Sequence, residues 1–220
     1  MFRTKIQKNK KNNYYTESGG FTLIETMISV ALFLAVVMTG MGALLNASFI
    51  HTKSQDIRSI VDNLSFIMED MSRDIRTGYS YNCMDYSIPS LPPSDNPTLE
   101  TPRNCSSGGW ALFFEASNGV PINPGDQWVY YINSDGNLFR STQSGDNPVQ
   151  LNSNDITFTL GGVGNLGSGF VVTGAESNDT MQPFVTIRLI GKIHSKKDNS
   201  DIPFSLQTSV SQRLIDIQTP

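Results

Sequence analysis

The chain has 220 residues, with 20 acidic and 16 basic side chains and a formal net charge of −4. An acidic chain disfavours non-specific binding to nucleic acids, which depends on Lys and Arg side chains that neutralise phosphates. We therefore expect no clear nucleic-acid binding, and we interpret one local cluster of positive side chains, within 192–197, as a solvated strand end.

The first segment, 1–20, is short, polar and basic. It contains one acidic residue, Glu17, and five basic residues: Arg3, Lys5, Lys8, Lys10 and Lys11. Basic residues beside a membrane segment hold that side of the segment in the cytoplasm, so the rest of the chain is expected outside. Small residues, Gly19 and Gly20, stand before the apolar segment, whereas a secretory signal has its small-residue cleavage site after it. Cleavage after Gly20 would keep the apolar helix and create a new amino terminus at Phe21.

The next segment, 21–45, is apolar and carries one ionisable side chain, Glu25. As a helix it is about 37 Å long, enough to cross roughly 30 Å of hydrocarbon with some tilt. A carboxylate on such a helix costs roughly 2.5–3.5 kcal/mol on insertion scales, so it is disfavoured without a partner. Two interpretations remain open: Glu25 lies at the headgroups of a simple anchor, or it pairs with a group inside the membrane.

The amino terminus resembles that of the type IV pilin superfamily, which comprises pilins, minor pilins and the pseudopilins of type II secretion. The resemblance rests on the basic leader, on Gly20 followed by Phe-Thr-Leu-Ile-Glu at 21–25, and on the long apolar helix. It implies that a prepilin peptidase cleaves between Gly20 and Phe21 and methylates the new amine of Phe21. It also implies that Glu25 acts in assembly, with other pilin or pseudopilin subunits and an inner-membrane assembly platform as partners.

Physical chemistry supports an assembly role for the apolar helix. The new ammonium group of Phe21 on one subunit can pair with Glu25 on a neighbour, and such charges attract more strongly in a low-dielectric layer than in water. Small residues, which permit close helix–helix approach in lipid, recur at every fourth position: Ala31, Ala35, Thr39, Ala43 and Ala47. The alternative is that alanine is simply common in membrane helices.

The segment 46–78 changes from uniformly apolar to amphipathic. Its apolar residues step by three and four, which predicts one helical face: Ile57, Val61, Leu64, Met68, Met71 and Ile75. Gly78 predicts the end of this helix, which we expect to run from about Phe21 to Thr77. The apolar face needs a cover, which we expect from the carboxy-terminal domain or, in part, from a neighbouring subunit.

The remainder, 79–220, is predicted to be one β-rich extracytoplasmic domain. Runs rich in aromatic and branched residues predict strands at 110–116, 127–133, 138–140, 156–160, 184–193 and 204–210. The turn 134–137 predicts a hairpin, and 194–201 is predicted to be a polar loop between the last two strands. Strands that follow one long helix predict an α+β fold, with an antiparallel sheet laid on the helix. The order of these strands resembles the J-type minor pseudopilins, although hairpins of this composition are common.

The chain has two cysteines, Cys83 and Cys105. An exported domain meets an oxidising environment, where a pair of cysteines indicates a disulfide. Closing this loop would stabilise the fold by about 3 kcal/mol in the chain-entropy model. Two free thiols are the alternative. The proline-rich loop between the cysteines and the glycine-rich run 161–169 are where we expect surface variation or partner contacts.

No enzyme is predicted. Neither histidine, His51 or His194, has a recognisable metal-binding or nucleophilic arrangement around it in the sequence. The run 161–169 lacks the Lys-Ser/Thr of a phosphate-binding loop. The polar residues 198–201 offer oxygen ligands for calcium but are more typical of a turn, so we expect no metal, no cofactor and no small-molecule substrate.

The sequence therefore predicts a structural subunit of a type IV pilus or of a type II secretion pseudopilus. It would cross the inner membrane once, with the leader in the cytoplasm, and then enter an extracytoplasmic filament. Two other hypotheses remain open: a single-pass anchored binding or adhesion module that does not polymerise, and an anchored enzyme with an unrecognised site. The residue at which the mature chain begins would distinguish the filament subunit from these two alternatives.

Overall fold

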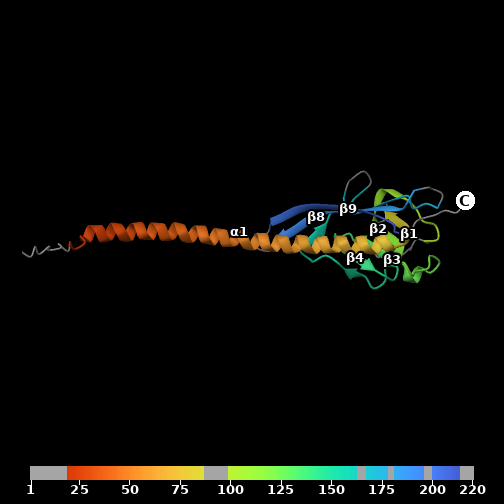
Figure 1. Cartoon of the computed structure of the whole chain (residues 1–220), viewed down its shortest axis with the longest axis horizontal. Helices are drawn as coiled ribbons and strands as arrows, with labels where there is room; N and C mark the ends of the chain where they lie inside the picture. Colours follow the sequence, from red (N-terminus) through yellow and green to blue (C-terminus); the bar gives the residue numbers. More distant parts are fainter. Residues whose placement is uncertain (1–18, 87–98, 163–166, 178–180, 196–199, 214–220) are drawn as a thin grey trace, which may run out of the picture. The chain divides into compact units, whose positions relative to one another are not determined.

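The computed structural model describes residues 19–86, 99–162, 167–177, 181–195 and 200–213. One long helix is followed by a mainly antiparallel β-sheet (Figure 1). The elements are α1 (Leu23–Thr77), β1 (Tyr79–Asp85), β2 (Cys105–Glu115), η1 (Pro124–Asp126), β3 (Trp128–Ile132), β4 (Leu138–Ser141), β5 (Val149–Gln150), β6 (Ile156–Phe158), β7 (Gly169–Thr173), β8 (Phe184–Ser195) and β9 (Ser200–Ser211). The chain divides between Gln55 and Asp56 into two compact units, and the second contains the sheet. The predicted α+β class is confirmed.

Helix α1 ends where the sequence predicts. Its last residue is Thr77, and the amide of Gly78 still donates to the carbonyl of Asp74 at 3.0 Å. A side chain at Gly78 would collide with the ring of Phe114 in β2, because a Cβ there would lie 2.4 Å from a ring carbon. Glycine therefore serves two needs at this position: it ends the helix and lets the chain turn directly onto the sheet.

The strands pair in the order β5-β4-β3-β2-β7-β8-β6, with β1 added on β2 and β9 added on β8. The predicted hairpin of β3 and β4 is present, and Gly136 takes a positive φ of 77° in its turn. The predicted pairing of the last two strands is also confirmed, since β8 and β9 run antiparallel from Phe184↔Ser211 to Ser195↔Ser200.

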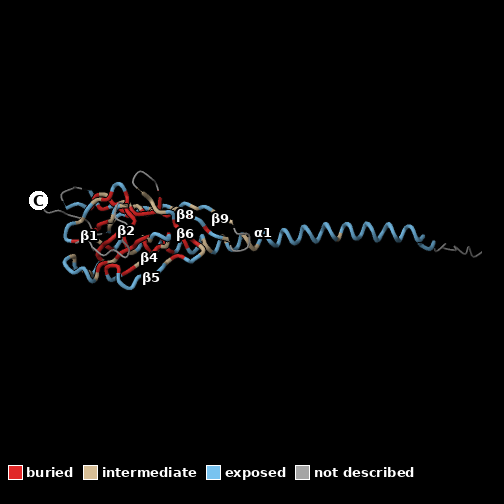
Figure 2. The backbone as a smooth tube through the Cα atoms, turned by 180° about the vertical axis from the view of Figure 1, so that it is seen from behind, coloured by how far each residue is buried: buried red, intermediate tan, exposed pale blue. Residues whose placement is uncertain are grey.

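The outer half of α1 packs on one face of this sheet and forms the main core (Figure 2). The helix contributes Leu64, Ile67, Met68, Met71 and Ile75. The predicted apolar face is confirmed from Leu64 to Ile75, whereas Ile57 is only half-buried and Val61 is 40% exposed. Ile60 and Val61 both lie about one helical turn before Leu64. Of these two residues, Ile60 is the one that packs partly against the core.

The other face of the sheet carries a second, smaller core. Along β2 the side chains alternate, so Leu112 and Phe114 join the core under the helix while Phe113 joins the second core. The second core also contains Leu99, Trp110, Ala111, Val129 and Tyr131. Strands β2 and β3 are therefore buried on both faces, which explains their nearly continuous apolar sequence.

Some sequence predictions for the sheet were wrong. Strands β1, β5 and β7 were not predicted. The predicted loop 194–201 is shorter than expected, because β8 continues to Ser195 and β9 begins at Ser200. In the glycine-rich run, where surface variation was expected, residues 167–169 are buried, and the backbone of Gly169 contacts Tyr86 and Gly109 so closely that no Cβ would fit. Residues 163–166 and most of the proline-rich loop, 87–98, lie outside the described residues.

Candidate functional site

The amino-terminal end of α1 is fixed by a side-chain cap. The hydroxyl of Thr22 accepts a hydrogen bond from the backbone amide of Glu25 at 3.3 Å, and α1 begins at Leu23. Thr22 is therefore the N-cap residue, and Glu25 lies in the first helical turn. A carboxylate in the first turn also complements the positive end of the helix dipole. The pattern Thr-x-x-Glu at 22–25 is a capping-box sequence, a signal that our sequence analysis did not use.

The predicted site residues at this end lie close together along the chain. Gly20 and Phe21 precede the helix, and both are exposed, Phe21 to 80%. A Cβ at Gly20 would meet no other atom within 4 Å, so the structure places no steric limit on a side chain there. Glu25 is exposed and makes no ion pair with another described residue.

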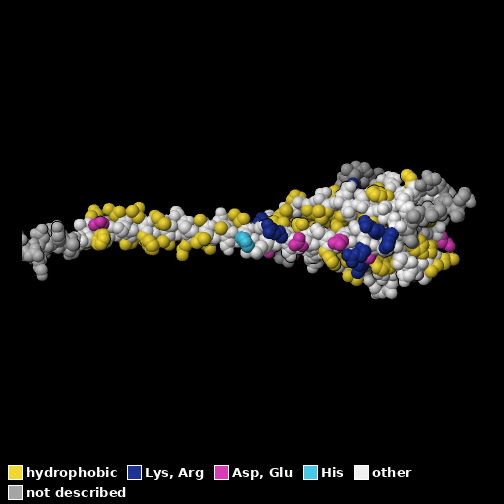
Figure 3. All heavy atoms as spheres, in the orientation of Figure 1, with side chains coloured by type: hydrophobic (Ala, Val, Ile, Leu, Met, Phe, Trp, Pro, Cys, Tyr) yellow, Lys and Arg dark blue, Asp and Glu magenta, His cyan; other side chains and the backbone are white. Residues whose placement is uncertain are grey.

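From Phe21 to Ile50 the chain exposes an almost unbroken apolar surface (Figure 3). Its large side chains, apart from the half-buried Val37, are exposed by between 46%, at Phe49, and 80%, at Phe21. The helix is long and apolar enough to span a membrane, and none of its most apolar stretch is buried within the chain. An apolar surface of this extent is not stable in water, so it requires lipid or other protein to cover it.

Two threonine hydroxyls in this stretch are satisfied within the helix itself. The hydroxyl of Thr26 donates to the carbonyl of Leu23 at 2.8 Å, and that of Thr39 donates to the carbonyl of Ala35 at 3.0 Å. Such internal bonds suit hydrocarbon, where no water is present to accept them. Glu25 is the one charged side chain of this stretch, and a charge in hydrocarbon requires a partner.

The predicted row of small residues forms a stripe along the exposed part of α1. Its members are all exposed: Ala31, Ala35, Thr39, Ala43 and Ala47. The helix is continuous past them, so neighbouring members of the row lie one above the other, and the row as a whole winds slowly around the helix, by about 40° per step. The stripe offers a surface on which another helix can approach closely.

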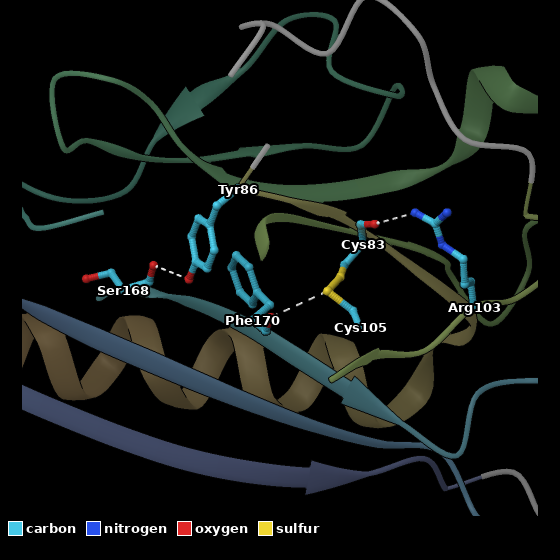
Figure 4. The surroundings of a disulfide bond; sticks show 6 residues. All are labelled: Cys83, Tyr86, Arg103, Cys105, Ser168 and Phe170. Carbon is cyan, nitrogen blue, oxygen red and sulfur yellow. Dashed lines mark hydrogen bonds between the residues drawn. A yellow bond between two sulfur atoms is a disulfide. The ribbon is translucent and has the colours of Figure 1, made fainter. Parts of the chain in front are cut away.

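The predicted disulfide is present and joins Cys83 in β1 to Cys105 in β2, with 6.1 Å between their Cα atoms (Figure 4). Arg103 donates to the carbonyl of Cys83 at 3.4 Å, and the sulfur of Cys105 lies 4.0 Å from the carbonyl oxygen of Phe170. Nearby, the hydroxyl of Tyr86 donates to the carbonyl of Ser168 at 2.9 Å. The disulfide thus holds the ends of the proline-rich loop against the middle of the sheet.

A polar network joins the outer half of α1 to the sheet. Arg140 of β4 forms ion pairs with Asp70 at 2.9 Å and Asp74 at 3.6 Å, and its guanidinium lies over the ring of Trp128. Tyr130 of β3 donates to the carboxylate of Asp74. Burial raises the pKa of Asp74 even though Tyr130 and Arg140 favour its charged form. These contacts link the helix to the sheet, so we assign them a structural role.

Neither histidine forms a recognisable catalytic arrangement. His51 is exposed on α1. His194 lies 3.1 Å from the carboxylate of Asp201 across the β8–β9 ladder, a neighbour that the sequence did not reveal. This pair lines a polar hollow with Asn154, Thr157, Thr159 and Lys192. Its members are largely exposed, and among the described residues no three His, Cys, Asp or Glu side chains are grouped as metal ligands.

The structure thus presents an exposed apolar helix that carries one acid, and a stapled α+β unit. No protein-family model, no curated protein sequence and no solved structure matches this chain significantly.

Proposed function

We propose that this chain is a structural subunit, a minor pilin or pseudopilin, that assembles into a filament through its amino-terminal helix. The observation that carries the proposal is the exposed apolar surface from Phe21 to Ile50, with Glu25 as its one charge. A lipid anchor needs only the apolar surface. An acid in the first turn, without an ion-pair partner among the described residues, favours pairing with a group on another chain.

In this proposal a prepilin peptidase removes residues 1–20, and Phe21 becomes the amino terminus. The new ammonium group on one subunit neutralises Glu25 on the next, and the small-residue stripe lets the helices approach. The β-unit then lies outside the membrane, where an oxidising environment suits the Cys83–Cys105 disulfide. A single-pass anchored binding module remains the second candidate, because an apolar helix and a disulfide fit it equally well.

Mass spectrometry of the intact protein extracted from membranes tests the proposal. A chain that begins at Phe21 and carries one added methyl group supports the filament subunit. A chain that retains Met1, or one that has lost the apolar helix, contradicts it. Gly20→Arg provides a matched control: the structure sets no steric limit at Gly20, so any loss of processing reflects recognition by the peptidase rather than misfolding.

A further inference from the structure

Strand β9 lies at an edge of the sheet and, among the described strands, pairs only with β8. Its ladder with β8 includes every residue from Ser200 to Ser211, so the strand is regular along its whole length. In an antiparallel pair, successive residues direct their N–H and C=O groups alternately toward the neighbouring strand and away from it. Half of the backbone groups of β9 are therefore open to a further strand.

The hydrogen bonds of β8 show which residues of β9 face the open edge. The amide of Thr159 donates to the carbonyl of Ile190 at 2.7 Å, so Ile190 directs its backbone groups away from β9. Ile190 pairs with Ser205, and Ser205 is therefore not bonded to β8. By alternation, all odd-numbered residues of β9 face the open edge. Pro203 belongs to this set, in agreement with the rule that proline, which has no N–H, occupies outward positions of edge strands.

Most of this edge carries no protection against a further strand. Natural edge strands are commonly protected by charged residues, by proline or by bulges. In β9 the one charged residue and the one proline, Asp201 and Pro203, lie within its first four positions, and the stretch 204–211 has neither. Its ladder with β8 shows no register shift there. The N–H and C=O groups that face outward in this stretch belong to Ser205, Gln207, Ser209 and Ser211.

The side of β9 that faces the main core is incompletely covered. Ile202, Phe204 and Leu206 are half-buried, whereas Leu189 and Ile193, their neighbours in β8, are buried. Phe204 and Leu206 pack at the margin of the main core. A further strand would place its own inward side chains beside these residues and remove the remaining apolar surface from water.

We propose that β9 is a docking edge for an extended segment of another polypeptide, which adds to the sheet as a further antiparallel strand. The outward N–H and C=O groups require an extended backbone as their partner. The half-buried Phe204 and Leu206 favour branched apolar side chains at alternate positions of that segment. Because the stretch 204–211 carries no charge, a segment without charged inward side chains fits it best.

A second copy of this chain fits the edge less well. β9 lies along the outer half of α1 (Figures 1 and 2), and the amide of Arg213, just after β9, donates to the carbonyl of Arg76 near the end of α1. Strand and helix therefore run in the same direction. Antiparallel pairing of two β9 strands would turn the outer halves of two α1 helices in opposite directions. In two chains anchored in one membrane, both outer halves begin at the membrane, which disfavours this arrangement.

Fluorescence anisotropy of a labelled synthetic peptide with the full chain in detergent micelles tests the proposal. The probe has the sequence of residues 185–192 of β8, which already pairs antiparallel with β9 and has apolar side chains at alternate positions. We expect saturable binding of one peptide per chain. N-methylation of the probe at Thr186, Arg188 and Ile190, whose amides would face β9, should weaken binding by about tenfold or more, because hydrogen bonds are lost.

The matched control is the same probe methylated at Val185, Ile187 and Leu189. These amides would face away from β9, so this peptide should bind like the unmodified probe. The proposal is overturned if the unmodified probe does not bind, or if the two methylated peptides bind equally well.

Gln207→Pro makes the corresponding change in the protein. It removes an outward N–H but no bond to β8, so the Tm should stay close to that of the unmodified protein while peptide binding weakens by about tenfold. Thr208→Pro removes a bond to β8 and should instead lower the Tm. If Gln207→Pro also lowers the Tm, the two methylated peptides decide the matter, because they leave the protein unchanged.

Light scattering of the protein in micelles tests the choice of occupant. A dimer of the unmodified protein that Gln207→Pro converts to a monomer would overturn the proposal, because it would show that β9 pairs with a second copy. The proposal is independent of filament assembly. A chain that binds the probe but is never processed at Phe21 would contradict the proposed function alone.

Discussion

The hydroxyl of Tyr130 in β3 donates a 2.7 Å hydrogen bond to the carboxylate of Asp74, one turn before the end of α1. The bond joins two residues separated by 56 positions in the chain, and burial raises the pKa of the Asp74 carboxyl. The helix is thus fixed on the sheet by a polar contact in addition to apolar packing.

Tyr130→Phe should lower the free energy of unfolding by about 1–3 kcal/mol, because a half-buried carboxylate loses its donor. Urea unfolding followed by circular dichroism measures this change. Tyr131→Phe is the control. Tyr131 lies on the opposite face, where its ring stacks on Phe139, and removal of its hydroxyl should have little effect. Equal effects of the two variants would contradict the role assigned to the Tyr130–Asp74 bond.

Two consecutive residues of α1 separate the core-facing side of the helix from its outer side. Ile67 is 5% exposed and Phe66 is 70% exposed. Ile67→Ala should cost about 2–5 kcal/mol of stability, whereas Phe66→Ala should stay within about 0.5 kcal/mol. Chemical denaturation of both variants checks this expectation. A large loss from Phe66→Ala in the isolated subunit would show that the helix face is assigned wrongly.

Removal of the disulfide should destabilise the β-unit. Replacement of both Cys83 and Cys105 by Ser should cost about 3 kcal/mol, since the bond closes a loop over a sequence separation of 22. Peptide mapping without reductant should first show the two cysteines joined in protein from the cell envelope. Dithiothreitol should lower the Tm of the unmodified protein and leave that of the double variant unchanged. A common response of both proteins to dithiothreitol would refute the bond's contribution.

Glu25→Val should leave membrane insertion and leader cleavage intact but strongly reduce incorporation into filaments. The physical reason is the loss of the carboxylate that neutralises an adjacent subunit's amine. Quantitative immunoblots of sheared filaments and of membranes measure the two pools. Glu69→Val is the control, because Glu69 is an exposed helical glutamate paired only weakly with Arg73. Normal incorporation of Glu25→Val would exclude the pairing.

Glu115 should make the stability of the fold depend on pH. Burial, followed by the charge of Asp126, raises its pKa from 4.5 to about 7. The folded state then binds a proton more tightly than the unfolded state, so stability falls as the pH rises from about 4.5 to about 7. Asp126 and Tyr79 are the other titratable groups that interact with it.

Glu115→Gln should remove most of this pH dependence, because glutamine does not titrate in this range. Urea unfolding at pH 5 and at pH 7 measures the difference, and Glu100→Gln should retain the slope of the unmodified protein. Parallel pH profiles for the unmodified protein and Glu115→Gln would show that the carboxylate is not perturbed.

Much of the fold follows from local patterns in the sequence. The end of α1 at Gly78, the β3–β4 hairpin with Gly136 in its turn and the β8–β9 pair all depend on neighbours in the chain, so turn chemistry and periodicity predict them. The strands that were missed depend on distant partners. In β1, a register shift between Tyr79 and Asn82 and a positive φ of 58° at Ser80 disrupt the alternation that identifies a strand.

The site features were predictable only in part. Glu25 could be identified from the sequence, because it is the one acid in a long apolar segment. Glu115 could not, because a polar residue at the end of a strand is common in a sequence. Its burial depends on neighbours brought to it by the fold, among them Gly119, which lies close to its carboxylate. The contact of His194 with Asp201 likewise depends on the register of β8 and β9, which a sequence does not specify.

Two edge strands of the sheet, β5 and β9, differ greatly in length. At one end of the pairing order is β5, with two residues, while β9 offers twelve and, among the described strands, pairs only with β8. A foreign strand gains main-chain bonds in proportion to the length of edge it can follow. Exchange of strands between copies at high concentration should therefore start along β9, and a solubilising charge placed there would suppress it more effectively than one on β5.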